Sequence, residues 1–397
     1  MPATRSTPPP RGIALLLAAL SSLGPFAIDT YLPSFHDIGA SLSATPIEVQ
    51  QTLTAYLLPF ALMTLWHGAI ADALGRRRVI LVALALFALA TAGCALATRI
   101  EVLWLLRALQ GMTAGAGVVV SRAIVRDLYD GAPAQRLMAQ ISMMFALAPA
   151  VAPVVGGWLQ AWFGWRAVFI FLVLLTVLLW LVCWRLLPET LPPERRQSLR
   201  PAYLWQSYRS VLSSPRFLAA TAALSFNFLG FFVYVLSAPV FLMRHLQLPE
   251  TAFFWLFGPA MGGLVVGSWL SGRLAGRVST TGTLQRSYLL MAAAAAINIG
   301  LCLALPPALP WSVAPIFLYT LGMALAMPSL TLLALDPYPE KRGLAASCQT
   351  FLQSGFNAVA AGVLAPLLWG STLTLAAGMA GFMLLGGCAA WAQRRLE

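Results

Sequence analysis

Residues 167–184 read AVFIFLVLLTVLLWLVCW, an apolar run between Arg166 and Arg185 that contains no charged residue. A helix needs about 20 such residues to cross the hydrocarbon core of a bilayer. Similar runs recur at regular intervals from Gly12 to Trp391. They lack the alternation of apolar and polar residues that a membrane β-strand requires, so we expect helices. The chain is therefore predicted to be an all-α polytopic membrane protein.

The composition of the 397 residues agrees, because 59% are hydrophobic and only 10% are charged. Soluble domains carry about 25% charged residues. The net charge of +12 could suggest nucleic acid as a partner. However, the charges lie between apolar runs and not on one soluble face, so no nucleic-acid binding is predicted. The five cysteines are scattered and the three histidines are far apart in sequence, which predicts neither a disulfide framework nor a metal site.

Twelve membrane spans are expected in two groups of six. Their approximate positions are 13–35, 48–70, 79–98, 102–124, 137–160, 166–186, 216–240, 251–272, 287–305, 311–333, 343–368 and 371–391. The one long connection, 187–215, is rich in proline and arginine. It divides the chain into an N-terminal six-helix bundle (1–186), a cytoplasmic linker (187–215) and a C-terminal six-helix bundle (216–397).

The basic residues predict the orientation. With the N-terminus in the cytoplasm, 21 of the 25 Lys and Arg residues fall on the cytoplasmic side. The other four are Arg99, Arg107, Arg166 and Arg244. Cytoplasmic loops carry the excess of basic residues, so both termini are expected in the cytoplasm.

A weak internal repeat supports two parallel halves. Residues 23–35 and 229–241 share five of thirteen positions at a constant offset of 206. Transporters are often built from such repeats. The position equivalent to Asp29 in the second half is Val235, so the two halves are chemically unequal.

Asp29 is the one carboxylate expected deep inside a span, where it lies between Pro25 and Pro33. A charge at the bilayer centre costs a few kcal/mol or more, and such residues usually serve an ion or proton pathway. The two prolines weaken the helix on either side of the acid. The alternatives are a structural hydrogen bond or a place in the headgroup region.

Arg107 lies about one turn from the outer end of the expected fourth span, with Gln110 one turn further along the same face. Its side chain could face a cavity, in which Gln110 is a further candidate for substrate binding, or it could extend outward to the membrane surface.

Two further stretches are candidates for segments that gate transport. Residues 68–78 (GAIADALGRRR) combine Asp72, a tight turn at Gly75 and an arginine run that begins with Arg76. Anchoring of positive charge at the cytoplasmic surface explains part of that run. Residues 148–157 (APAVAPVVGG) predict a bent, closely packed helix through Pro149, Pro153, Gly156 and Gly157.

Polar stripes on two spans suggest a cavity or, equally, interhelical hydrogen bonds. The candidate ligand-binding side chains on these spans are Asn227, Phe231, Tyr234, Gln349, Gln353 and Asn357. Tyr31, Tyr56 and Met144 would suit an apolar ligand, although such residues more often serve packing.

No phosphate-binding GxxxxGK loop and no hydrolase or redox motif occurs in the sequence. We therefore expect neither an enzyme nor a bound cofactor. Energy for transport would come from a gradient or from another subunit.

These elements together resemble the major facilitator superfamily. The loop 68–78 resembles its signature between helices two and three, residues 106–111 resemble its helix-four arginine motif, and residues 148–157 resemble the helix-five motif of its antiporters.

A closer resemblance is to the Bcr/CflA group of drug:proton antiporters. It rests on Ile28-Asp29-x-Tyr31-Leu32-Pro33, on Arg126-Asp127-x-Tyr129 and on residues 187–196 (LPETLPPERR). That group exports small antibiotics such as bicyclomycin and phenicols across the bacterial inner membrane. The resemblance implies that Asp29 couples proton and substrate and that Arg107 assists. It also implies a cytoplasmic gate at Asp72, Arg76, Arg126 and Asp127.

The sequence departs from the family pattern in two places. Ala73 replaces the usual basic residue after the loop aspartate, and Ser21 stands where some relatives carry a second acid. We predict a monomeric, proton-driven exporter of small apolar or amphipathic drugs. Export of an endogenous metabolite such as an amino acid or sugar is the alternative. A membrane sensor is disfavoured because no soluble signalling domain is attached.

Overall fold

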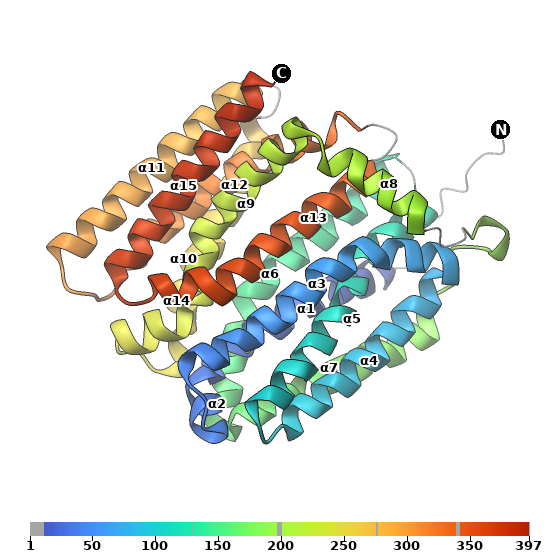
Figure 1. Cartoon of the computed structure of the whole chain (residues 1–397), viewed down its shortest axis with the longest axis horizontal. Coiled ribbons are helices and arrows are strands. Elements are labelled where there is room, and N and C mark those ends of the chain that lie inside the picture. The colour runs from blue at the N-terminus through green and yellow to red at the C-terminus, as the bar shows by residue number, and fades with distance from the viewer. Residues whose placement is uncertain (1–11, 130, 197–200, 275–276, 339–341, 397) are drawn as a thin grey trace.

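The computed structural model describes residues 12–129, 131–196, 201–274, 277–338 and 342–396, with some side chains inside these ranges left undescribed. Long helices dominate the described chain and run side by side (Figure 1). The helices of the first half are α1 (Ile13–Asp29), a 3₁₀ turn η1 (Leu32–Ser34), α2 (Phe35–Leu42), α3 (Pro46–Leu74), α4 (Arg76–Leu96), α5 (Ile100–Leu128), α6 (Gly131–Phe163) and α7 (Trp165–Leu186).

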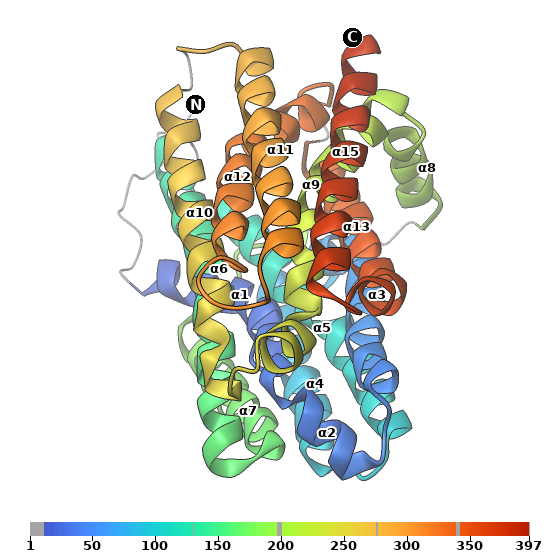
Figure 2. The same ribbon diagram turned by 90° about the vertical axis from the view of Figure 1, so that its left-hand side faces the viewer.

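The linker holds a 3₁₀ turn and one short helix, and the second half follows it. These elements are η2 (Pro193–Arg195), α8 (Pro201–Leu212), α9 (Pro215–Leu236), a π-turn η3 (Val240–His245), a 3₁₀ turn η4 (Glu250–Phe253), α10 (Phe254–Leu274), α11 (Thr280–Ala304), α12 (Ala314–Leu335), α13 (Arg342–Val359), a π-turn η5 (Ala360–Leu364), α14 (Ala365–Leu368) and α15 (Thr372–Arg395). The linker helix α8 and the short helix α2 lie at opposite ends of the molecule (Figures 1 and 2).

Within the described residues, eleven helical segments are long and apolar enough to cross a membrane. The 33-residue helix α6 stands where the fifth span is predicted. The all-α polytopic fold is therefore confirmed. The first span differs in detail, because its helix is interrupted after Asp29 by the turn η1 before continuing as α2. Pro33 is the middle residue of that turn, and a proline does not continue a regular helix.

Helices pack closely within each half and touch across the boundary between the halves. In the first half α3 packs on α5, α4 on α7 and α1 on α6. In the second half α9 packs on α15 and α10 on α12, while α3–α13 and α6–α10 contacts join the halves. Glycine permits the closest approach: a Cβ at Gly111 of α5 would overlap the backbone carbonyl of Tyr56 on α3.

The predicted linker is not simply a loop, because α8 forms within it. Tyr208 and Val211 are buried on one face of this helix, whereas Trp205 and Arg209 are exposed on the other. A helix of this length is marginal alone, so packing of the apolar face must stabilise it.

Candidate functional site

Arg107 is fully buried on α5. Its guanidinium carbon lies 4.8 Å from the ring centroid of Tyr31 and 4.5 Å from that of Tyr56. The Nη1 group donates hydrogen bonds to Gln110 Oε1 at 2.8 Å and to the Ala27 carbonyl at 3.2 Å. A planar guanidinium suits contact with aromatic faces better than an ammonium does. The side chain therefore faces inward and does not extend to the membrane surface.

Hydrogen bonds hold the two tyrosines and Gln110 around this cation. The Tyr31 hydroxyl lies 2.5 Å from Thr52 Oγ1, and the Tyr56 hydroxyl donates to a carbonyl of α1 at 3.1 Å. Gln110 Nε2 donates to Thr91 Oγ1 at 2.7 Å. Three residues predicted to bind substrate thus form the walls of the Arg107 site.

Asp29 is the last residue of α1 and is only 4% exposed. Among the described residues no ion pair joins Asp29 to Arg107, and the Nε and Nη2 donors of Arg107 are buried without a hydrogen-bond partner. Arg107 nevertheless bonds to Ala27, two residues before the acid, and Tyr56 lies within electrostatic range of Asp29. The region thus holds a buried acid and, in contact with the same helix α1 through the Ala27 carbonyl, a separate buried cation whose donors are incompletely satisfied.

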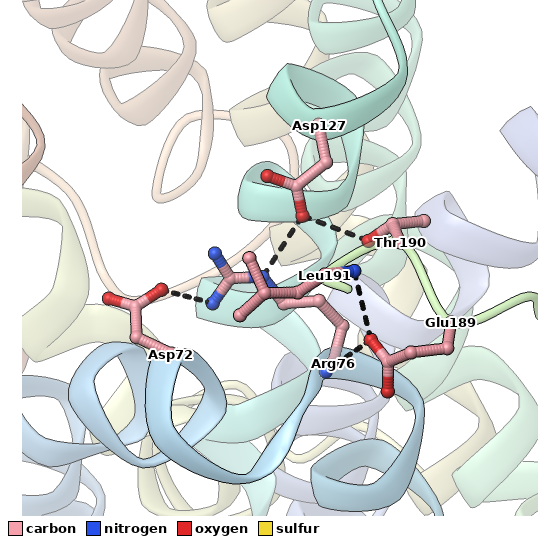
Figure 3. Close-up of polar contacts among 6 residues, drawn as sticks. All are labelled: Asp72, Arg76, Asp127, Glu189, Thr190 and Leu191. Atoms are coloured by element: carbon pink, nitrogen blue, oxygen red, sulfur yellow. Dashed lines mark hydrogen bonds and ion pairs between the residues drawn. The ribbon is translucent and has the colours of Figure 1, made fainter. Parts of the chain in front are cut away.

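The predicted gate residues Asp72, Arg76 and Asp127 form one ion-pair network (Figure 3). Arg76 Nη1 lies 2.5 Å from Asp72 Oδ1, and its Nε lies 3.0 Å from Asp127 Oδ2. Arg76 is buried, whereas the Asp72 side chain is 39% exposed. The network joins the end of α3, the start of α4 and the end of α5. Arg126, the neighbour of Asp127, reaches the second half, because its Nη1 lies 3.2 Å from where a Cβ at Gly343 would be.

Glu189 and Thr190 of the linker complete this network (Figure 3). The sequence marked them only as part of the 187–196 motif and gave neither residue a role. Glu189 Oε1 accepts the backbone N–H of Arg76 at 2.9 Å, and the Thr190 hydroxyl donates to Asp127 at 2.8 Å. Gly75 precedes α4 with φ +98°, a backbone conformation that favours glycine. Because glycine has no side chain, the N-cap residue itself cannot cap the helix. Glu189 supplies that cap from the linker, and its negative charge suits a helix N-terminus.

The linker helix α8 bridges the two halves at the same end of the molecule. The Tyr208 hydroxyl donates to the Leu65 carbonyl of α3 at 2.5 Å. The same ring belongs to a buried cluster with residues of the second half, including Phe217 and Cys348. Burial raises the pKa of Tyr208 to about 12, so the phenol keeps the proton that it donates.

Helix α6 continues through Pro149 and Pro153. Beyond them, the two predicted gate glycines face opposite neighbours. A Cβ at Gly156 would overlap the Thr30 carbonyl next to Asp29, and one at Gly157 would overlap the Glu250 carbonyl of the second half. Close packing here therefore requires glycine at both positions.

The two polar stripes of the second half differ in how their side chains are hydrogen-bonded. Asn227 Nδ2 donates to Tyr288 at 2.9 Å, and the Tyr234 hydroxyl accepts from Asn298 at 2.8 Å, so these two bond between helices. In contrast, Gln349 Nε2 and Asn357 Oδ1 are buried with no hydrogen-bond partner among the described residues. Phe231 is buried and Gln353 is half-buried. The side chain of Met144 lies outside the described part of the chain.

Comparison with known families decides the family of this chain. A family model described as Major Facilitator Superfamily matches residues 14–361. The chain belongs to the major facilitator superfamily.

Curated bacterial members of the superfamily resemble this facilitator along most of its length. An uncharacterised transporter of this type from Bacillus subtilis, YdgK, is 33% identical over 337 residues, or 84% of each chain. A bicyclomycin resistance protein homologue from Haemophilus influenzae is 31% identical over 264 residues, or 66% of each chain. Multidrug resistance protein D of Escherichia coli is 28% identical over 360 residues, which cover 89% of this chain and 88% of its own.

Solved structures support the facilitator fold independently. A bacterial homologue of the human lysosomal transporter Spinster superposes with a TM-score of 0.71 at 17% identity, covering 98% of this chain and 97% of its own. The protein is thus a multi-pass membrane transporter of the facilitator type, with its buried acid and cation in the first half of the fold.

Proposed function

We propose that this transporter exports small drugs or antibiotics in exchange for protons. The observation that carries the proposal is Asp29, a carboxylate only 4% exposed where the first span is interrupted, two residues after the Ala27 carbonyl that Arg107 binds. A carboxylate held inside the membrane is costly unless it serves an ion or proton pathway. The relatives named for bicyclomycin and multidrug resistance support the substrate class.

In the proposed cycle Asp29 either binds a proton or contacts the substrate, and it does not do both at once. Proton entry from outside would therefore displace the drug on the outer side. Arg107 would favour the charged form of Asp29 in a state that brings the two side chains together, because a neighbouring cation stabilises a carboxylate. Its Nε and Nη2 donors lack partners among the described residues, so they are available to a carboxylate or polar substrate group in another state.

The substrate would be an apolar or amphipathic small molecule. Tyr31, Tyr56 and Gln110 surround the buried cation and would offer it aromatic faces and an amide. On the opposite half, the unsatisfied polar atoms of Gln349 and Asn357 are the groups best suited to a ligand. Gln353, Phe231, Asn227, Tyr234 and Met144 remain predicted contacts.

The two halves would alternate about this central region. In that cycle the network of Asp72, Arg76 and Asp127 would stabilise the cytoplasmic side when it is closed, and the glycines of α6 would close the outer side. The protein would lie in the bacterial inner membrane as a monomer, with both termini in the cytoplasm. The proton gradient would supply the energy, and no cofactor would be required.

The test is export of chloramphenicol, a phenicol, from energised vesicles that contain Asp29→Asn. The expected result is loss of proton-coupled export, with the variant folded and inserted at the wild-type level. Glu101→Gln is the matched control, since Glu101 is an exposed acid at the start of α5. Unchanged export by Asp29→Asn would contradict the proposal.

A further inference from the structure

Helix α2 lies at the opposite end of the molecule from the linker helix α8 (Figure 2), and a group of polar side chains surrounds its first turn. Asp37 stands in the first turn of α2 and accepts a short hydrogen bond from Gln160 Nε2 of α6. Gln160 is 3% exposed, and its Oε1 atom is buried with no hydrogen-bond partner among the described residues. This amide therefore has one satisfied end and one open acceptor.

The second half of the fold meets the first at this point. The turn η4 packs on α6 and on η1, and the Glu250 backbone carbonyl touches Gly157, one turn before Gln160. The Glu250 side chain lies within electrostatic range of Asp37 and of His36. Gln51 Nε2 also donates across the boundary to the Gly362 carbonyl at 3.0 Å, so this end is closed in the structure.

We propose that Asp37, Gln160 and Glu250 form a proton-binding site that closes the outer side of the transporter. With a proton on Glu250, its O–H would donate to Gln160 Oε1 while Gln160 Nε2 donates to Asp37. This chain would satisfy the open acceptor, whose burial without a partner is otherwise costly. Loss of the proton would leave two carboxylates facing each other across the boundary, and like charges disfavour that arrangement.

The sign of the response follows from this arrangement. At low outer pH Glu250 is protonated and the outer side stays closed, whereas at higher pH the ionised pair drives the halves apart. In the proton-driven export cycle proposed above, on which this role rests, an external proton would thus promote closure after drug release.

Other charged groups near the site are few in the described chain. On α2, His36 is exposed. The turn η3 packs on η4 and carries Arg244, which is exposed, and His245, whose ring bonds to the Trp369 carbonyl. Arg166 of α7 bonds to Ser41, at the far end of α2 from Asp37, and to the Ala97 carbonyl.

The experiment measures the outer distance directly as the pH changes. Spin labels would be placed on Ala40→Cys and Ala304→Cys, exposed alanines of α2 and α11, in a full-length chain whose native cysteines have been replaced. We expect the longer-distance population to grow as pH rises, changing the ratio of the two populations roughly fivefold or more. Glu250→Gln should remain closed at every pH, because an amide keeps the donor and carries no charge.

Two controls separate the groups. Glu101→Gln and His36→Gln should each keep the pH response, which would exclude a general effect of acid loss and an effect of the histidine. A distance that does not change with pH in the wild-type chain would overturn the proposal. It would also be overturned if the distance in Glu250→Gln changed with pH as it does in the wild type. Proton-coupled export with an unchanging outer distance would contradict this site alone. An outer distance that changes with pH in a protein that shows no proton-coupled export would contradict only the proposed function.

Discussion

Substitution of Gly156 by alanine tests how the helices are packed beside Asp29. In the structure a Cβ at this position would overlap the Thr30 carbonyl oxygen, and it would lie 2.7 Å from the carbonyl carbon and 3.0 Å from Thr30 Cα. Carbon atoms normally approach to about 3.5 Å or more. The atoms in the way belong to the backbone, so no side-chain rotation can relieve the overlap. Helices α1 and α6 would have to separate by roughly 1 Å.

The expected cost of Gly156→Ala is about 3 kcal/mol in the free energy of unfolding, at the upper end of what overpacking a core costs. Gly300→Ala is the matched control, because Gly300 of α11 has no atom within 4 Å of its Cβ position. That substitution should change stability by less than about 1 kcal/mol, and in the favourable direction.

Thermal unfolding of both purified variants in the same detergent gives the comparison. We expect a clearly lower midpoint for Gly156→Ala and lost export, because the break in the first span would be displaced. If Gly156→Ala were as stable and active as Gly300→Ala, the close packing of α1 on α6 would be refuted.

Three other substitutions probe the remaining contacts. Arg107→Lys keeps the charge but loses the planar contact with two rings, so chloramphenicol export should fall about tenfold or more at normal membrane abundance, measured in vesicles. Glu189→Gln removes the charge that caps α4, so amide hydrogen exchange in the first turn of α4 should accelerate, whereas Glu194→Gln in the same linker should leave it unchanged. Tyr208→Phe removes one hydrogen bond of about 1 kcal/mol, so alkylation of the buried Cys348, followed by mass spectrometry, should become roughly fivefold faster. Wild-type rates in that variant would show that α8 does not restrain the two halves.

Apolar run length and the spacing of polar residues predicted much of this molecule. Runs of about 20 residues allow little but membrane helices. Arg107 and Gln110, three positions apart on one helix, were expected to share a face, and they are hydrogen-bonded to each other. The inward orientation of Arg107 could not be established from sequence, because extension to the surface was also compatible with its place near a helix end.

Contacts between distant segments were beyond sequence reasoning. Glu189 belongs to the proline-rich 187–196 motif, but the motif did not indicate its partner, the N-terminus of a helix that begins 113 residues earlier. Tyr208 bonds to a carbonyl 143 residues away, and the pattern of α8 is too short to stand out beside the membrane spans. For Asn227 and Tyr234 the sequence left a ligand cavity and interhelical hydrogen bonds open as alternatives. Their hydrogen-bond partners on α11 became visible only in the structure.

The central claim is that Asp29 exchanges a proton for the drug, and proton release on drug binding tests it most directly. Chloramphenicol would be added to the purified transporter in weakly buffered detergent solution while the pH is recorded. The account predicts that the wild-type protein releases protons on binding and that Asp29→Asn releases none. Equal proton release from both proteins, or drug binding by the wild type with no release, would contradict the account.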